Sequence, residues 1–349
     1  MKNTTQLKRS RRTFIAKLAL FLTFSSVVTA FAADSLEQYP GIIGKDEWLF
    51  YRNELTSSED APGAKNSLSL IQQFNQVLQK KGVQLLIVMV PIKMRIHEEH
   101  LPDDIKINDY MRSNYERMLA TLRSSGVTSV DLNTAFLKSP HRTSDTPLFF
   151  RLDTHWAKTG AMLAAETIGA EILSNPVLKN TISQIPTQSY TLTTGKAKGA
   201  TRSRDILQLL PPDSPARKYP YERYFSMSVS RTDVNNSDLL GKQESPDIGL
   251  VGSSYTIDWT GFADGLRYSL QKNIFSIGVS ATQGSWVGME TYLRDDAFQT
   301  NPPKLLLWEI PERDMYAPPD YKYREARYIL SNAEWLKRVT DLVNKAPTP

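Results

Sequence analysis

The chain has 349 residues, of which 40% are hydrophobic and 23% charged, which is the composition of a globular protein with room for a sizeable core. This composition excludes a disordered chain and a multi-spanning membrane protein. The formal net charge of +5 originates in the first 32 residues, which hold six Lys and Arg and no Asp or Glu, whereas 36 basic and 37 acidic residues make up the rest. We therefore expect no nucleic-acid partner.

Residues 1–32 have the features of an export signal. A basic segment precedes an apolar run from Leu18 to Val28 and a small-x-small cleavage sequence, Ala30-Phe31-Ala32. Arg11-Arg12 also resembles the twin-arginine pattern, so Sec and Tat export both remain open. The apolar run is short for a spanning helix, and an uncleaved anchor is the alternative. We expect residues 33–349 to work outside the cytoplasm. The absence of Cys excludes disulfides and a thiolate nucleophile.

Strand-like and helix-like patterns alternate along the first half of the predicted domain. Apolar residues at helical spacing or in near-continuous runs predict a strand ending at Tyr51, a helix over 67–81, a buried strand from Val83 to Pro91, a helix over 109–124, a short strand over 127–132 and an Ala-rich helix over 156–173.

Residues from about 175 to 245 are more polar and predict an irregular, partly β insertion that forms one wall of a cleft. Turn signals are expected at Thr191–Gly195 and Pro211–Asp213, and a strand-like alternation at Tyr224–Val229. The α/β pattern then resumes, with strands over 248–251, 274–279 and 304–311 and helices over about 260–271, 286–296 and 331–344. Such alternation predicts an α/β fold with a mostly parallel sheet covered on both faces.

The pairing of a carboxylate and an imidazole at Asp153 and His155 is a first candidate for catalysis. A triad needs an acid that orients one ring nitrogen of a histidine while the other takes a proton. The alternative is that Asp153 or Thr154 only caps the following helix.

A candidate nucleophile follows the strand that ends at Gly252. Ser253 and Ser254 stand at its carboxyl end, where open α/β sheets place ligands, and glycine permits the tight turn that exposes a serine oxygen. The alternative is that Gly252-Ser253-Ser254 is an ordinary turn that only ends the strand.

The remaining three histidines are not expected to take part in catalysis. His97 and His100 lack the spacing of a metal motif and are expected in a solvated surface turn, and His141 is expected in an exposed loop. No phosphate-binding glycine loop or dinucleotide fingerprint appears. We expect no metal and no cofactor.

Five segments together resemble the alginate O-acetyltransferase family (AlgJ/AlgX-like). They are Gly44–Tyr51, Val90–Lys93, Asp153–Trp156, Gly252–Tyr255 and Trp308–Arg313. The resemblance implies a periplasmic, SGNH-hydrolase-like three-layer α/β/α domain that acts on exopolysaccharide. It also implies that Asp153 is the orienting acid, His155 the general base and Ser254 the nucleophile, in a permuted chain order.

The resemblance further implies an acetyl donor relayed from a membrane-bound acyltransferase, a polysaccharide acceptor and other exopolysaccharide biosynthesis proteins as partners. The chain ends soon after Tyr316, which is closer to the AlgJ-like layout than to AlgX-like members with a C-terminal carbohydrate-binding module. Alginate, acetylated cellulose and other polymers stay open as acceptors.

Four residues are candidates for substrate binding. Tyr255 and Trp259 could stack on a sugar or a donor, with core packing as the alternative. Lys93 and Arg313 could contact an anionic polymer or form structural ion pairs. Two other functions are also open: a secreted carbohydrate esterase that uses the same triad with water, and a non-catalytic polymer-binding subunit of a secretion complex.

Overall fold

The computed structural model describes residues 38–199, 204–233 and 246–349, and the predicted export signal lies outside these residues. The chain divides into two units, Met1–Pro40 and Gly41–Pro349, and the second contains the fold described below. Across the described ranges, no helix is both long and apolar enough to cross a membrane.

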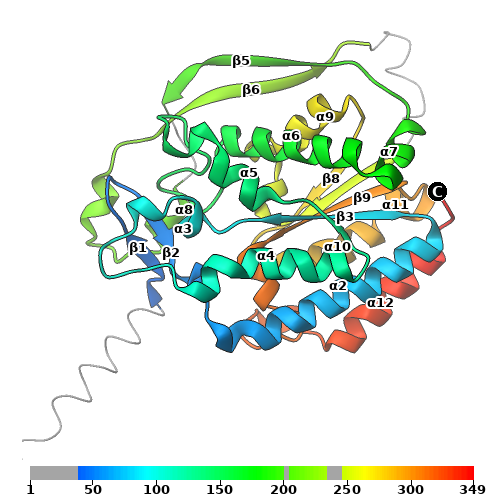
Figure 1. Ribbon diagram of the computed structural model, residues 1–349, viewed down its shortest axis with the longest axis horizontal. Coiled ribbons are helices and arrows are strands. Elements are labelled where there is room, and N and C mark those ends of the chain that lie inside the picture. The colour runs from blue at the N-terminus through cyan, green and yellow to red at the C-terminus, as the bar shows by residue number, and fades with distance from the viewer. Residues whose placement is uncertain (1–37, 200–203, 234–245) are drawn as a thin grey trace, which may run out of the picture. The chain divides into compact units, whose positions relative to one another are not determined.

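A five-stranded, wholly parallel sheet forms the centre of the fold (Figure 1). Its strand order is β4–β3–β9–β7–β8, and the bounds of the strands are Thr128–Ser129 (β4), Gln84–Val90 (β3), Leu305–Pro311 (β9), Ile248–Gly252 (β7) and Phe275–Gly278 (β8). β3 and β9 are adjacent over seven residue pairs, from Gln84 with Leu305 to Val90 with Pro311. The near-continuous apolar sequence of these strands follows from burial on both faces.

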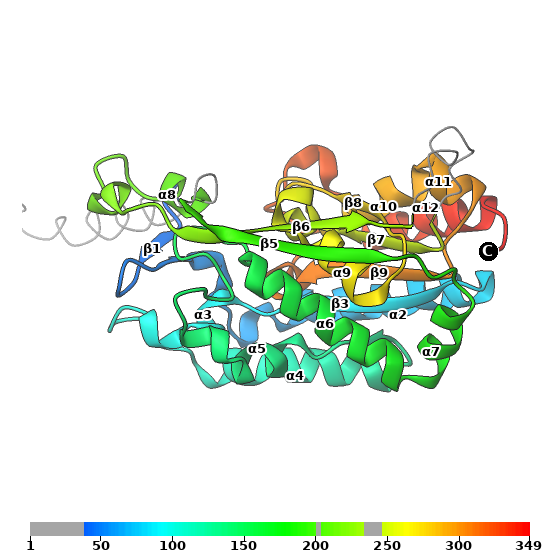
Figure 2. The same ribbon diagram turned by 90° about the horizontal axis from the view of Figure 1, so that it is seen from above.

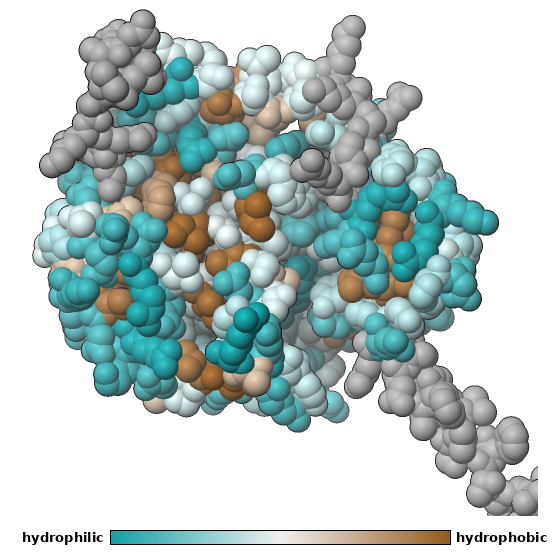
Figure 3. All heavy atoms as spheres, turned by 180° about the vertical axis from the view of Figure 1, so that it is seen from behind, coloured by the Kyte–Doolittle hydropathy of each residue, from teal (hydrophilic) through white to brown (hydrophobic). Residues whose placement is uncertain are grey.

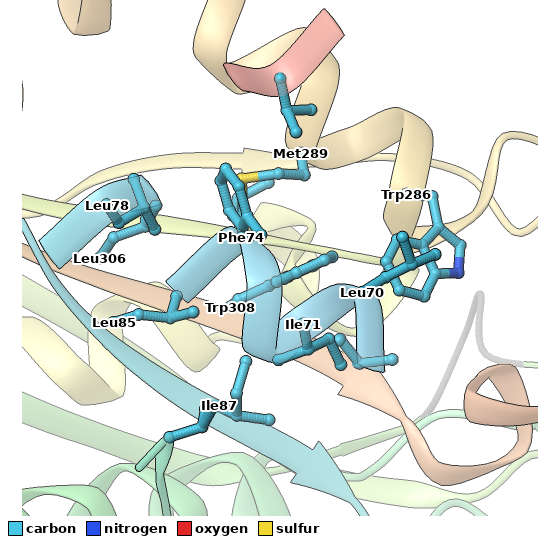
Figure 4. Close-up of a cluster of buried hydrophobic side chains, with 14 of the residues drawn as sticks. Leu70, Ile71, Phe74, Leu78, Leu85, Ile87, Trp286, Met289, Leu306 and Trp308 are labelled. Carbon is cyan, nitrogen blue, oxygen red and sulfur yellow. The ribbon is translucent and has the colours of Figure 1, made fainter. Parts of the chain in front are cut away.

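Helices cover both faces of the sheet, as the alternation of side chains along a strand requires. Leu85, Ile87 and Met89 of β3 pack on one face against α2 (Ala61–Lys81), α4 (Asp109–Ser124), α10 (Gly284–Arg294) and α12 (Asn332–Lys345). Figure 4 shows part of this cluster, with Phe74 and Trp308 among its aromatic members.

Leu86 and Val88 of β3 face the opposite layer. That layer contains α5 (Leu132–Lys138), α6 (Lys158–Ser174), α7 (Pro176–Ser183) and α9 (Phe262–Leu270). The small residues of α6 allow α9 to approach closely, because a side chain at Gly265 would begin 3.2 Å from Cβ of Ala165. The predicted three-layer α/β/α arrangement is confirmed.

Local signals explain where the principal helices start and stop. Asn108 caps α4 by accepting from the Met111 N–H at 2.8 Å, and Ser331 caps α12 by accepting from the Glu334 N–H. Gly82 ends α2 in the left-handed region, with φ 86°. The Ala-rich helix expected from Trp156 begins instead at Lys158, because Trp156 forms a β-bridge with Phe149.

Two small antiparallel pairs lie outside the main sheet. β1 (Gly41–Ile43) pairs with β2 (Leu49–Tyr51), and β5 (Tyr190–Gly199) pairs with β6 (Arg223–Arg231). Figures 1 and 2 both show β5 and β6 running beside α6. Seen from behind in Figure 3, apolar residues (brown) form separate patches among polar ones, with a hollow across this face.

The structure corrects the prediction for part of the insertion. Thr191–Gly195, expected as a turn, belongs to β5, where pairing with β6 overrides the local turn composition. Gly195 lies where the regular pairing of β5 with β6 is interrupted, since the register shifts between Thr194 and Ala197. The region also begins with an ordered helix, α7, and contains the short helix α8 (Asp205–Gln208).

Candidate active site

The candidate nucleophile stands at the carboxyl end of β7. Ser253 caps a short 3-10 turn, Ser254–Thr256, and its Oγ accepts from the Tyr255 N–H at 3.2 Å. Ser253 is buried, whereas the Ser254 side chain is partly accessible. Glycine is required at position 252, because a Cβ there would collide with Glu309 Oε2 and lie only 2.5 Å from Thr256 Oγ1.

A buried carboxylate from the neighbouring strand β9 holds this turn. Glu309 Oε2 accepts from the Ser253 N–H at 2.7 Å, the Ser253 hydroxyl at 2.9 Å and the Thr256 hydroxyl at 3.1 Å. Burial raises the pKa of Glu309 to about 7, although these three donors favour the charged form. Glu309 therefore positions the nucleophile turn without itself approaching the Ser254 hydroxyl.

Asp153, His155 and Ser254 form a continuous chain of hydrogen bonds. His155 Nδ1 lies 2.6 Å from Asp153 Oδ1, and His155 Nε2 lies 2.7 Å from Ser254 Oγ. The His155 backbone N–H also donates to Asp153 Oδ1, at 3.0 Å. With the Nδ1 proton donated to the carboxylate, Nε2 is the nitrogen free to accept from the serine hydroxyl.

The environment keeps Asp153 charged. Burial works against the charged form, but the hydrogen bonds and charge of His155 outweigh it, so the pKa of Asp153 is lowered from its ordinary value. An anionic Asp153 fixes the orientation of the imidazole and stabilises it when it becomes protonated. This is the electrostatic requirement for a histidine that activates a serine.

The segment that carries the acid and the base is a loop closed by the Phe149–Trp156 bridge, and buried charged side chains bind much of the remaining backbone. The Lys93 ammonium donates to three carbonyls, those of Leu49 at 2.6 Å, Arg151 at 2.9 Å and Asp153 at 2.9 Å. Burial lowers the pKa of Lys93 to about 8. Since its side chain is buried and its donors are occupied, Lys93 serves the fold and does not reach a polymer.

Two carboxylates of the insertion bind the N–H groups of the same segment. Glu222 accepts from the Arg151 N–H at 2.5 Å and the Leu152 N–H at 3.1 Å. Asp205 Oδ1 accepts from the Thr154 N–H at 2.7 Å. The insertion therefore contributes structurally to the site.

Asp205 also approaches the base directly. Its Oδ2 lies 3.6 Å from His155 Nδ1, and its own N–H donates to Asp153 Oδ2 at 2.8 Å. Partial burial and the nearby Asp153 charge raise the pKa of Asp205.

Asp153, His155 and Asp205 place potential metal-ligand atoms within 4.8 Å of one another. The carboxylate oxygens of Asp153 and Asp205 accept from N–H groups, and Asp205 Oδ2 also accepts from the Thr154 hydroxyl at 2.5 Å. Hydrogen bonding accounts for the cluster without an ion.

One backbone donor beside the nucleophile faces no acceptor. Within the described parts of the chain, the Ser254 N–H makes no hydrogen bond, whereas the Tyr255 N–H is occupied by Ser253 Oγ. Of the two N–H groups that could stabilise a developing oxyanion, the Ser254 N–H is the one free to do so.

Tyr255 and Arg313 lie in the interior beside the site. The Tyr255 hydroxyl donates to the Thr154 carbonyl at 2.5 Å and accepts from Arg313 Nη1 at 3.2 Å. Arg313 also lies 3.6 Å from buried Glu54 and stacks over the ring of Tyr51. Both side chains are engaged by protein groups, which favours the packing and ion-pair interpretations over contact with substrate.

Trp259 differs from them, because 42% of its surface is exposed. The ring centroids of Trp259 and His155 are 5.1 Å apart, in an edge-to-face arrangement. Of the four candidate substrate-binding residues, Trp259 is the one with an accessible side chain next to the base.

The other histidines lie away from Ser254. The expectation of a solvated turn is wrong for His97, which is fully buried between Trp48 and Phe149, with ring-centroid distances of 4.3 and 6.0 Å. His100 is partly exposed, stacks on Trp48 and pairs with Asp46 at 2.9 Å. His141 is exposed, as predicted.

Sequence reasoning missed Glu309, Asp205 and Glu222. Glu309 could have been suspected, because it is the one acidic residue in the apolar run 304–311. Asp205 and Glu222 lie 51 and 71 residues from the backbone groups they bind, in a segment of ordinary polar composition. No local pattern connects these two residues with the site.

The parallel sheet and the linked carboxylate, imidazole and hydroxyl at its carboxyl edge define an α/β protein suited to serine-based acyl transfer. Residues 42–312 match the family described as ALGX, "SGNH hydrolase-like domain, acetyltransferase AlgX". The chain belongs to this family of SGNH hydrolase-like acetyltransferases. The predicted family and the predicted enzyme class are thereby confirmed.

Curated relatives agree with this assignment, and a solved structure agrees with the fold. The chain is 29% identical over 309 residues to "Probable alginate O-acetylase AlgJ" of Pseudomonas aeruginosa, covering 84% of this chain and 75% of that protein. It is 27% identical to "Alginate biosynthesis protein AlgX" of Azotobacter vinelandii, over 83% of this chain and 58% of that one. The fold resembles the O-acetyltransferase domain of Pseudomonas putida AlgJ, with a TM-score of 0.70 and 23% identity, over 86% of this chain and 98% of that one.

Proposed function

We propose that this protein is a periplasmic O-acetyltransferase that moves acetyl groups through Ser254 onto hydroxyls of an exopolysaccharide such as alginate. The observation that carries the proposal is the hydrogen-bonded chain from Asp153 through His155 to Ser254 in a member of an acetyltransferase family. The names of the AlgJ and AlgX relatives support a polysaccharide acceptor.

The first half of the reaction forms an acetyl-enzyme. His155 Nε2 takes the proton of the Ser254 hydroxyl as Oγ attacks the acetyl carbonyl of the donor. The Ser254 N–H donates to the developing oxyanion. The bond between the acetyl group and the donor then breaks, and the leaving group takes the proton from His155. Asp153 stabilises the protonated imidazole throughout.

The second half transfers the acetyl group. A sugar hydroxyl gives its proton to His155 Nε2, and its oxygen attacks the acetyl-serine carbonyl. The bond to Ser254 Oγ breaks, Oγ takes the proton back, and the free enzyme is restored. The proposed partners are a membrane-bound acyltransferase that relays the acetyl donor and other exopolysaccharide biosynthesis proteins.

Ser254→Ala and His155→Ala test the assignment. Incubation with an activated acetyl ester and an oligosaccharide should give acetylated sugar with the wild type, and both variants should lose about three or more orders of magnitude in rate. The removal of the nucleophile or of its base accounts for the loss. Mass spectrometry of the sugar and assay of free acetate separate transfer from hydrolysis.

Two controls accompany the catalytic variants. His141→Ala removes an exposed histidine and should leave the rate unchanged. Ser253→Ala should lose less than Ser254→Ala, since Ser253 is buried against Glu309. Wild-type rates in both catalytic variants would refute the proposal, and free acetate without acetylated sugar would favour the esterase.

A further inference from the structure

Trp259 presents an accessible aromatic surface beside the catalytic base. It lies five residues after Ser254, in a short 3-10 turn, Asp258–Thr260. Its ring lies edge-to-face with His155, and its other ring neighbour is Phe150, with a centroid separation of 6.4 Å. A large exposed indole in this position is unusual in a fold whose other aromatic clusters are mostly buried.

The turn that carries Trp259 is held in place. Lys158 Nζ donates to the Trp259 carbonyl at 2.6 Å, and the Thr260 hydroxyl lies 2.8 Å from the carbonyls of Tyr255 and Ile257. Gly261 ends the turn at φ 80°, in the left-handed region. The indole is therefore presented by an ordered scaffold, which lowers the entropy cost of binding a ligand to it.

A second exposed aromatic residue lines a small cavity that includes Phe150, the ring neighbour of Trp259. Phe225 of β6 is 42% exposed and lines a cavity of about 30 Å³ together with Phe150, Lys158, Glu222 and Tyr224. Lys158 lines this cavity and also binds the Trp259 carbonyl, so the cavity lies next to the turn that carries Trp259.

Geometry limits what can occupy this surface. An acceptor hydroxyl that attacks acetyl-Ser254 must come within hydrogen-bond reach of His155 Nε2, so the sugar that carries it must lie next to Trp259. One face of a pyranose ring consists largely of C–H groups, which pack against the electron-rich face of an aromatic ring. The surface has the chemistry that a sugar ring needs.

We propose that Trp259 and Phe225 form the acceptor subsite, in which Trp259 stacks on the pyranose ring that receives the acetyl group and Phe225 contacts a neighbouring sugar. This inference rests on the proposed function and adds the position of the polymer to it. The subsite acts in the second half of the reaction, in which the acetyl-enzyme is attacked either by sugar or by water.

The partition of the acetyl-enzyme between sugar and water tests the subsite. Trp259→Ala and Phe225→Ala should each lower the ratio of acetylated sugar to free acetate, about tenfold or more for Trp259→Ala and less for Phe225→Ala. KM for the oligosaccharide should rise. Trp259→Phe should recover part of the ratio, because it restores an aromatic face. Tyr323→Ala, which removes a 74% exposed tyrosine, is the matched control and should change neither quantity.

Binding to the Ser254→Ala protein gives a readout that does not need catalysis. Calorimetry with an alginate oligosaccharide and a cello-oligosaccharide should detect binding of at least one, and the added Trp259→Ala substitution should weaken it about tenfold. Failure of transfer with intact Trp259-dependent binding would count against the proposed function alone. Equal partition ratios in wild type and Trp259→Ala, or no binding of either oligosaccharide, would overturn the subsite.

Discussion

The two sides of the active site are built in different ways. On the nucleophile side, Ser254 follows a strand of the central sheet, and one buried carboxylate, Glu309, holds its turn. On the base side, His155 lies in an irregular segment whose backbone is bound by Lys93, Asp205 and Glu222. Regular structure positions the serine, whereas ionisable side chains from distant segments position the histidine.

The base side should therefore be more sensitive to the loss of a single charged side chain. A strand end is held by sheet hydrogen bonds and packing, and these are spread over many residues. An irregular segment depends on a few groups, each of which satisfies several backbone atoms that would otherwise be buried without partners. Substitutions can test this contrast.

Lys93→Met should have the largest effect. It removes the ammonium donor from three carbonyls, of which that of Arg151 keeps another partner, the Leu49 N–H, so we expect a loss of roughly 3 kcal/mol in the free energy of unfolding. Activity per folded molecule should also fall, because Asp153 and His155 lose their support. Urea denaturation and the acetyl-transfer assay measure the two effects.

Lys272→Met is the matched control for this substitution. Lys272 is also buried and donates to the Ile185 carbonyl at 2.5 Å, far along the chain from the acid and the base. Its loss should lower stability but leave activity per folded molecule unchanged. A Lys93→Met protein that is destabilised yet fully active would contradict the dependence of the base side on Lys93.

Glu309→Gln tests the nucleophile side through pH. In the unfolded chain a glutamate has a pKa near 4.3, whereas burial raises the pKa of Glu309 to about 7 in the folded protein. Between these values the folded state binds the proton more tightly, so the contribution of Glu309 to stability falls as pH rises from about 4.5 to about 7.

The glutamine variant cannot titrate and should lose this pH dependence, about 3 kcal/mol across the range. Other buried carboxyls with raised pKa values, such as Glu54 and Glu222, act in the same direction, so the difference between variant and wild type isolates Glu309. Denaturation midpoints at pH 5 and pH 8 give the measurement. Parallel pH profiles for both proteins would show that Glu309 does not titrate in this range.

Asp205→Asn should have the smallest effect on stability but a clear one on rate. Asparagine can still accept from the Thr154 N–H, while the negative charge 3.6 Å from His155 Nδ1 is lost. We expect the transfer rate to fall about tenfold, because that charge favours the protonated imidazole formed during the reaction. The side chain is 41% exposed, so solvent screening limits the effect.

The pH–rate profile separates an electrostatic role of Asp205 from a structural one. The groups that face His155 are Asp153, Thr154, Asp205, Ser254, Tyr255 and Trp259. Removal of one negative charge should move the acid limb of the profile to lower pH. An unshifted limb with a lower rate would mean that Asp205 acts only by holding the backbone.

The sequence predicted those features that local patterns encode. The buried strands β3, β7 and β9 are near-continuous apolar runs, and the helices α4 and α12 have apolar stripes and capping residues, so their ends were placed within a few residues. The proximity of Asp153, His155 and Ser254 came from the family resemblance, since no periodicity places residues 99 positions apart together.

The remaining features depend on tertiary contacts. His97 lies in a polar sequence but is buried by Trp48 and Phe149, which come from other segments. Thr191–Gly195 has the composition of a turn but pairs with β6. The support that Asp205 and Glu222 give to the catalytic segment likewise depends on how a long insertion folds back, which no local signal specifies.

The hydrogen bond from Tyr255 to the Thr154 carbonyl has a consequence for how the site moves. Tyr255 is the residue after the nucleophile, and Thr154 is the residue before the base, so one bond across 101 positions of sequence joins the two immediate neighbours. Ser254 and His155 are thus connected by a path of four residues that bypasses the rest of the domain. We expect the thermal displacements of the sheet edge and of the irregular segment to be correlated. Ser254 Oγ and His155 Nε2, which exchange a proton, should then keep their separation while the surrounding loops fluctuate.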